Sequence, residues 1–232
     1  MKRSHSIGPF LSSQETLWGI VYLAFQMLAL PSILYWINGS LNASLNEGEL
    51  NFVYYLINFI STLVIFHEFW GDSMHHATRH PIDLLQAVIL GLAAYYASNF
   101  CIMQVIPLLA PGFSNYNDEA IFAMNQGSSF LLIISTVVLV PPAEECLYRG
   151  LIFRNLYSKN KWIAYIVSIL LFSMIHILGY WGQYSPLELI LAVLQYLPAG
   201  LWLAWCYAKS GTIIAPMLMH AAINYITIRT MR

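Results

Sequence analysis

Long apolar runs, separated by short polar segments, are the feature of this sequence that most constrains its fold. A helix needs about 20 mostly apolar residues to cross the roughly 30 Å of hydrocarbon in a bilayer, because it rises about 1.5 Å per residue. Only 9% of the 232 residues are charged, whereas an average soluble domain carries about a quarter. The sequence therefore predicts one all-α integral membrane domain over residues 1–232, a polytopic transmembrane helical bundle.

Seven apolar runs are candidate spans, within an expected range of six to eight. The first follows a basic N-terminus but contains no clear small-residue cleavage site, so we expect a retained span and not a cleaved signal. The seventh is short enough for a re-entrant or tilted helix. The runs cover residues 17–38, 51–69, 82–109, 128–156, 162–179, 187–207 and 212–228.

The distribution of Lys and Arg predicts the orientation, because cytoplasmic loops carry an excess of these residues. Segments 39–50, 110–127 and 180–186 contain neither. The N-terminus is therefore predicted on the cytoplasmic side, and the short chain favours a prokaryotic cell membrane. An odd number of spans conflicts with this rule, since it places the C-terminal arginines outside. The N-terminus and the alternate segments hold Lys2, Arg3, Arg79, Arg154, Lys159, Lys161 and Lys209.

Net charge and cysteine usage argue against a nucleic-acid-binding protein and against a fold held by disulfides or zinc. The formal net charge is -1, so no basic field favours nucleic acid as a partner. The three cysteines stand singly in apolar stretches without a CxxC pair. We expect them to be small buried hydrophobes and not a disulfide framework or a zinc knot.

The run 128–156 contains two adjacent carboxylates and an arginine, and charges inside a span are costly enough to mark functional sites. On a helix, Glu145 and Arg149 lie four residues apart on one face, which predicts an ion pair. Glu144 points about 100° away and is left to face a cavity. Pro141 and Pro142 weaken the helix just before the carboxylates and favour a break that admits water. The alternative is a buried ion-pair cluster that only locks helix packing.

Two later runs carry polar residues at comparable depth. His176 closes the segment FSMIH, while His220 and Asn224 share a helix face at i,i+4 spacing. Counted from the predicted cytoplasmic helix ends, Glu144 lies about 18 Å deep and His176 about 21 Å, but His220 only about 12 Å. This agreement favours one shared site, least securely for His220. The alternative is that these residues only pack or join helices by hydrogen bonds.

This set of residues predicts water activation and attack on an amide carbonyl. Glu144 would act as general base, with His176 orienting the water. His220 and Asn224 would donate hydrogen bonds to the developing oxyanion, while Glu145 and Arg149 support the helix. No serine or cysteine has an obvious partner, so a covalent acyl-enzyme is not favoured.

The segments EECLYR, FSMIH and HAAIN resemble the EExxxR, FxxxH and HxxxN/B motifs of the CAAX-processing and bacteriocin-processing intramembrane proteases (CPBP, Abi or type II CAAX endopeptidases). The resemblance covers about 125–228, the expected catalytic core. It implies a helical membrane fold, a cavity open toward the cytoplasmic leaflet and glutamate-dependent peptidase activity. By motif position, Glu144 resembles the catalytic base, His176 its water-orienting partner, His220 and Asn224 the oxyanion donors, and Glu145 and Arg149 the remaining motif residues.

The expected function is an intramembrane endopeptidase acting on a membrane-associated peptide or a lipidated protein. CAAX proteins, pro-peptides and bacteriocin leaders all fit. The alternative is a non-catalytic bacteriocin self-immunity or membrane scaffold protein. A proton-conducting transporter is ranked last, since no chain of carboxylates crosses the membrane.

No metal cofactor is expected. Two histidines and one glutamate could ligate zinc, but there is no HExxH motif, and the third motif holds Asn224 where a further ligand would be expected. A second histidine group, between His67 and His80, is expected to be a polar loop near the lipid headgroups, with a metal site as the alternative.

Overall fold

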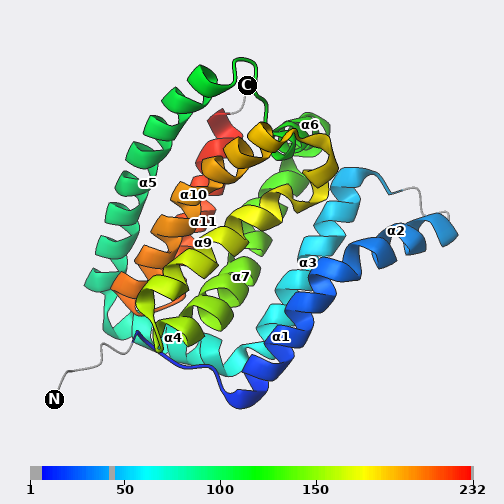
Figure 1. The fold of residues 1–232 in the computed structure, drawn as a ribbon. Coiled ribbons are helices and arrows are strands. Elements are labelled where there is room, and N and C mark those ends of the chain that lie inside the picture. Colours follow the sequence, from blue (N-terminus) through cyan, green and yellow to red (C-terminus); the bar gives the residue numbers. More distant parts are fainter. Residues whose placement is uncertain (1–6, 42–44, 231–232) are drawn as a thin grey trace.

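The computed structural model describes residues 7–41 and 45–230, and every regular element in these ranges is a helix (Figure 1). The predicted all-α fold class is confirmed. The α-helices are α1 Ser13–Leu28, α2 Leu30–Ser40, α3 Glu47–Ile65, α4 His67–Arg79, α5 Pro81–Leu109, α6 Tyr116–Ile133, α7 Val140–Glu145, α8 Arg154–Tyr157, α9 Lys161–Ile177, α10 Pro186–Ser210 and α11 Ile214–Thr230. Two π-helices, η1 Ile134–Leu139 and η2 Cys146–Phe153, and the 3-10 helix η3 Leu178–Gln183 join them.

Five helical stretches in the described residues are long and apolar enough to cross a membrane, and six if the bent pair α1–α2 counts as one span. The sixth reaches the lower end of the expected range. The seventh predicted run forms α11, whose 17 residues fall short of the others. Residues Glu47–Ile65, Pro81–Leu109, Ser129–Tyr157, Lys161–Gln183 and Pro186–Ser210 form the five.

The first predicted span is not continuous. A bend of 51° separates α1 from α2. Pro31 is the second residue of α2, and its ring can neither donate a backbone hydrogen bond nor fit against the carbonyl four residues earlier. The apolar run 17–38 showed the length of this helical region but not its break.

The expected polar loop between His67 and His80 is wrong, because this segment forms α4. Phe69, Ser73 and Ala77 recur every four residues and bury one face of the helix. Thr212 donates to the carbonyl of Ser73 at 2.8 Å, which fastens α4 to the turn before α11. The histidines point mostly outward, which is why the segment appears polar in sequence.

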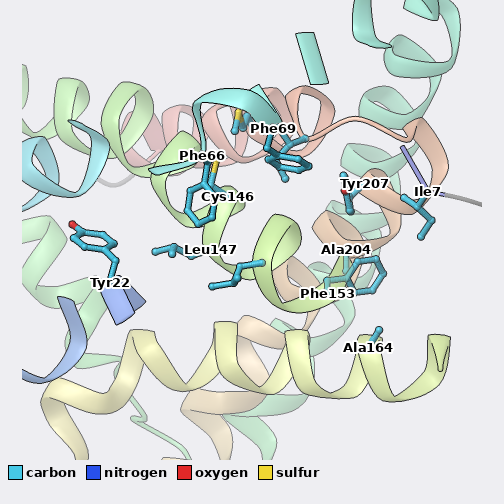
Figure 2. Close-up of a cluster of buried hydrophobic side chains, with 13 residues drawn as sticks. Ile7, Tyr22, Phe66, Phe69, Cys146, Leu147, Phe153, Ala164, Ala204 and Tyr207 are labelled. Atoms are coloured by element: carbon cyan, nitrogen blue, oxygen red, sulfur yellow. The ribbon is translucent and has the colours of Figure 1, made fainter. Parts of the chain in front are cut away.

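A buried cluster fixes η2 against its neighbours (Figure 2). Phe66 and Phe69 approach it from the start of α4, Tyr22 from α1, and Tyr207 from α10. Cys146 and Cys206 are buried as expected, but Cys101 is exposed on α5. The cluster holds η2, which carries Arg149, in place. Its members are Ile7, Tyr22, Phe66, Phe69, Cys146, Leu147, Leu151, Phe153, Ala164, Ala204, Tyr207, Ile213 and Met217.

Different segments of the chain meet at the two ends of the bundle. At the end with α4, Arg154 donates to the carbonyls of Gly8 and Pro9, both at 3.2 Å, and fastens the N-terminal segment there. At the opposite end lie α6, the start of α3 and the C-terminal end of α11 (Figure 1). The backbone N–H of Tyr116 donates to the Tyr184 hydroxyl at 2.9 Å there. The N-terminal segment and α6 are therefore at opposite ends.

Candidate active site

The chain around the two glutamates departs from regular α-helix on both sides, since π-helices η1 and η2 flank α7. In η1, the N–H of Val140 bonds the carbonyl of Ser135. The next N–H along would serve Thr136, but Pro141 has none. The Asn224 side-chain amide donates to the Thr136 carbonyl at 2.7 Å instead. Asn224 therefore satisfies a carbonyl that the proline leaves without a backbone partner.

Glu145 is fully buried and joins two helices. Its Oε1 accepts from Arg149 Nη1 at 3.0 Å, as the i,i+4 spacing predicted. The same oxygen lies 2.9 Å from His220 Nδ1 on α11. Since a carboxylate oxygen beside a guanidinium accepts, Nδ1 of His220 is the donor. Arg149 also lies over the Phe172 ring, 4.3 Å from its centroid, and donates to the carbonyl of Gly200.

Glu144 has no hydrogen bond or ion pair within 7–41 and 45–230, and its Oε2 is buried. It borders a cavity of about 1110 Å³ between the helices. Burying a carboxylate without a hydrogen-bond partner costs free energy. Such a group is therefore expected to have a functional role or to bind a small polar molecule. The two adjacent glutamates therefore differ as the helix geometry predicted, with one committed to structure and one facing the cavity.

His176 is held in one ring orientation by its neighbours. Its Nδ1 lies 2.8 Å from the carbonyl of Phe172, so Nδ1 carries the proton and Nε2 keeps a lone pair. The ring is stacked on Tyr196 at a centroid distance of 4.4 Å, and contacts the Phe172 ring at 4.7 Å. The Phe172 ring also lies 5.8 Å from that of His220, so it packs near both imidazoles.

The cavity brings together the four predicted catalytic side chains. Glu144, His176, His220 and Asn224 all line it, although they come from α7, α9 and α11. Glu145 and Arg149 do not line it and lie behind it. The cavity runs from the exposed Glu47 at one end to the buried His220 at the other.

A hydrogen-bond network on the other wall of the cavity was missed by the sequence reasoning. Tyr196 donates its hydroxyl to Asp118 Oδ1 at 3.1 Å, and Gln195 donates to Asp118 Oδ2 at 2.6 Å. Asn117 donates to the Tyr196 hydroxyl at 3.0 Å, so α6 and α10 are joined beside His176. Burial raises the pKa of Asp118, and these hydrogen bonds partly offset that rise. In the sequence, Asn117 and Asp118 fall in the segment 110–127 and Gln195 lies in the middle of the apolar run 187–207, so no local pattern links them.

The cavity mouth and the N-terminal segment, described from Ile7, lie at opposite ends of the bundle. The mouth is formed by the start of α3 and by α6, which belong to the segments without Lys and Arg. Two expectations therefore conflict, because an N-terminus on the cytoplasmic side and a cavity open toward the cytoplasmic leaflet require the same end. Lys2 and Arg3, which supported the first, lie outside the described residues.

The donor set was also compared with the needs of a metal ion. Within the part of the chain that the structure describes, no three His, Cys, Asp or Glu side chains are arranged to hold a metal. This applies to the cavity and to the histidines of α4 alike. The residues do not fit a zinc site, so no step of the chemistry is assigned to a metal.

The fold and the site define the class of protein. Several apolar helices long enough for a bilayer make it a polytopic integral membrane protein. Inside the bundle, a carboxylate and two histidines face one cavity.

Residues 126–226 match the family model of the Rce1-like type II CAAX prenyl endopeptidases. The resemblance inferred from the three motifs is thereby confirmed for this part of the chain. All four cavity-lining candidates fall within the matched residues.

Curated proteins are similar to parts of this chain. YbdI, a UPF0177 protein of Lactococcus lactis, is 34% identical over 46% of this chain and 59% of its own length. "Putative membrane peptidase YdiL" of Bacillus subtilis is 29% identical over 49% of this chain and 42% of its own. The chain spans about half the length of the curated relatives it matches. No solved structure matches the chain.

Proposed function

We propose that this protein is an intramembrane endopeptidase that uses a glutamate to activate water. The observation that carries the proposal is the division between the adjacent glutamates. Glu145 is consumed by Arg149 and His220, whereas Glu144 faces the cavity without a partner among the described residues. The Rce1-like match and the name of the Bacillus relative support a peptidase.

Glu144 takes a proton from a water molecule as the water oxygen attacks the carbonyl carbon of the scissile peptide bond. The carbonyl π-electrons move onto oxygen and give a tetrahedral oxyanion. The C–N bond then breaks, and the proton held by Glu144 passes to the leaving nitrogen. Each turnover consumes one water and regenerates the carboxylate.

His176 orients the attacking water. Its Nδ1–H is bound to the Phe172 carbonyl, so Nε2 is the nitrogen available to accept a hydrogen bond from water. Stacking on Tyr196 restricts rotation of the ring. A water held between Glu144 and His176 therefore has an orientation set by two groups.

His220 and Asn224 stabilise the oxyanion, and each has at most one N–H left to donate to it. One N–H of the Asn224 amide is bound to Thr136, which leaves the second for the substrate. His220 is bound to Glu145 through Nδ1, so it donates through Nε2 only when the ring carries both protons. Removing a single oxyanion donor is expected to lower kcat about 10²-fold.

The location of the site determines the side of the membrane from which the substrate enters. We place the N-terminus in the cytoplasm of a prokaryotic cell, because most of the described Lys and Arg residues lie at its end of the bundle, Arg229 being at the other. A membrane-associated peptide or protein then reaches Glu144 through the mouth at the opposite end.

Cleavage of a peptide library by the purified protein in lipid nanodiscs tests the proposal. Glu144→Gln is expected to lower kcat/KM by about 10²–10⁴-fold, since it removes the general base and preserves shape. Glu119→Gln is the matched control, because this exposed glutamate on α6 does not line the cavity. Activity equal to the parent protein in Glu144→Gln would remove the assignment and favour a non-catalytic immunity or scaffold role.

Chelation distinguishes this chemistry from a metal-dependent one. Since the described residues do not fit a metal site, dialysis against EDTA is expected to leave kcat/KM unchanged. A loss restored only by added zinc would overturn the metal-free mechanism.

A further inference from the structure

The charged side chains that line the cavity are all acidic. Glu47 lies at its exposed mouth, Asp118 part way along, and Glu144 at depth. Among residues 7–41 and 45–230, the cavity lining contains no Lys or Arg. Arg229 is exposed at the same end of the bundle but does not line the cavity. A channel lined by one sign of charge between low-dielectric walls concentrates ligands of the opposite sign.

The lining also carries many polar groups beside a larger share of apolar surface. Twenty of the 37 lining residues carry a hydroxyl, phenol, amide, carboxylate or imidazole group. Tyr35, Asn51 and Asn99 line it, as do the amide-bearing residues of the network on α6 and α10. Such groups match the N–H and C=O groups of an extended peptide, each of which needs a partner away from water.

We propose that this cavity admits an unlipidated peptide segment carrying Lys or Arg, which enters past Glu47 from the end of the bundle opposite the N-terminus. This inference rests on the proposed peptidase function and names its substrate class. Glu47 attracts the cationic residues at the mouth, and the amides and phenols of the wall bind the peptide backbone. The scissile bond then lies at Glu144, in the part of the lining that includes the buried His220.

The probes are peptides with one common apolar core, flanked by Lys-Lys, Gln-Gln or Glu-Glu, and a farnesylated form of the Gln-Gln peptide. We expect the Lys-flanked peptide to have the highest kcat/KM at low ionic strength, and its advantage to shrink as salt screens the charges. Equal rates for all three flanks, or a preference for the farnesylated peptide regardless of flanking charge, would overturn the inference while leaving the peptidase intact.

Two variants on one helix turn isolate the contribution of the mouth. Glu47→Gln removes a charge that lines the cavity. Glu49→Gln removes a charge from the same helix end, does not line the cavity, and keeps the capping partner of Asn46 because Gln also caps. The Lys-to-Gln preference is expected to fall about 3- to 5-fold in the first variant and to stay unchanged in the second.

Binding separates failure of this inference from failure of the catalytic proposal. The fluorescent Lys-flanked peptide is titrated into Glu144→Gln protein in nanodiscs, with and without Glu47→Gln. Tighter binding of the Lys-flanked peptide that depends on Glu47 supports the inference even if the parent protein cleaves nothing. If neither binding nor cleavage depends on peptide charge, the inference is wrong.

Discussion

At the residue scale, the adjacent glutamates are expected to have different roles, Glu145 in stability and Glu144 in catalysis. Glu145 is fully buried between Arg149 and His220, so Glu145→Ala leaves a buried guanidinium without its partner. We expect this change to lower the free energy of unfolding by about 3–5 kcal/mol. Thermal unfolding in detergent measures the loss. Glu144→Gln is the comparison, and its Tm should match the parent because Glu144 has no partner to lose among the described residues.

Tyr196 is expected to position His176. Tyr196→Phe keeps the ring stacked on the imidazole and loses only the hydroxyl's hydrogen bonds to Asp118 and Asn117, whereas Tyr196→Leu loses the ring as well. The phenylalanine variant should keep most of its kcat, and the leucine variant should lose about tenfold, because small displacements of a catalytic group are costly. KM should change less than kcat in both. Equal losses in the two variants would assign the effect to the hydroxyl network and not to the ring.

The residue pairs that the sequence predicted are those within one helix. Glu145 and Arg149 pair as i,i+4 spacing requires, and Glu144 is turned away from them. The contact between His220 and Glu145 spans 75 positions, and no local pattern encodes it. The Asp118 network was missed for the same reason, since its members come from α6 and α10.

At the element scale, the π-helix η1 and Asn224 are coupled through one carbonyl. Asn224→Leu leaves the Thr136 carbonyl without its side-chain partner and should destabilise the protein by about 1–3 kcal/mol. Pro141→Ala restores an N–H at the position that serves this carbonyl, so the same leucine change should then cost less. A double-mutant cycle measures the difference, expected at about 1 kcal/mol. Strict additivity would show that the proline does not set the role of Asn224.

Apolar runs predicted where the helices lie but not how they break. The bend at Pro31 and the π-turns around α7 depend on which backbone groups find partners after folding. Polar composition also misled at α4, where one buried residue in four is enough to form a packed helix. Hydrophobic periodicity in a sequence reveals a helix only when its buried face is wide. A short helix with a narrow buried face has a mostly polar sequence, as a loop does.

At the scale of the whole molecule, α6 and the start of α3 lie at the end of the bundle opposite the N-terminal segment (Figure 1), and residues of both line the cavity. Arg79, Lys159 and Lys209 lie at the N-terminal end among the described residues, whereas Arg229 is exposed at the mouth end. From this excess and the positive-inside rule, we propose that this end is cytoplasmic and that the mouth lies on the other side of the membrane. The family resemblance alone implied the reverse.

Cysteine labelling in intact cells decides between these orientations. The parent for this test carries Cys101→Ala, because Cys146 and Cys206 are buried. Pro111→Cys places an exposed thiol at the mouth end, and Lys159→Cys places one at the other end. A membrane-impermeant maleimide should label the first in intact cells and the second only after permeabilisation. The reverse pattern would place the mouth in the cytoplasm, where a peptide exported before cleavage could not reach Glu144.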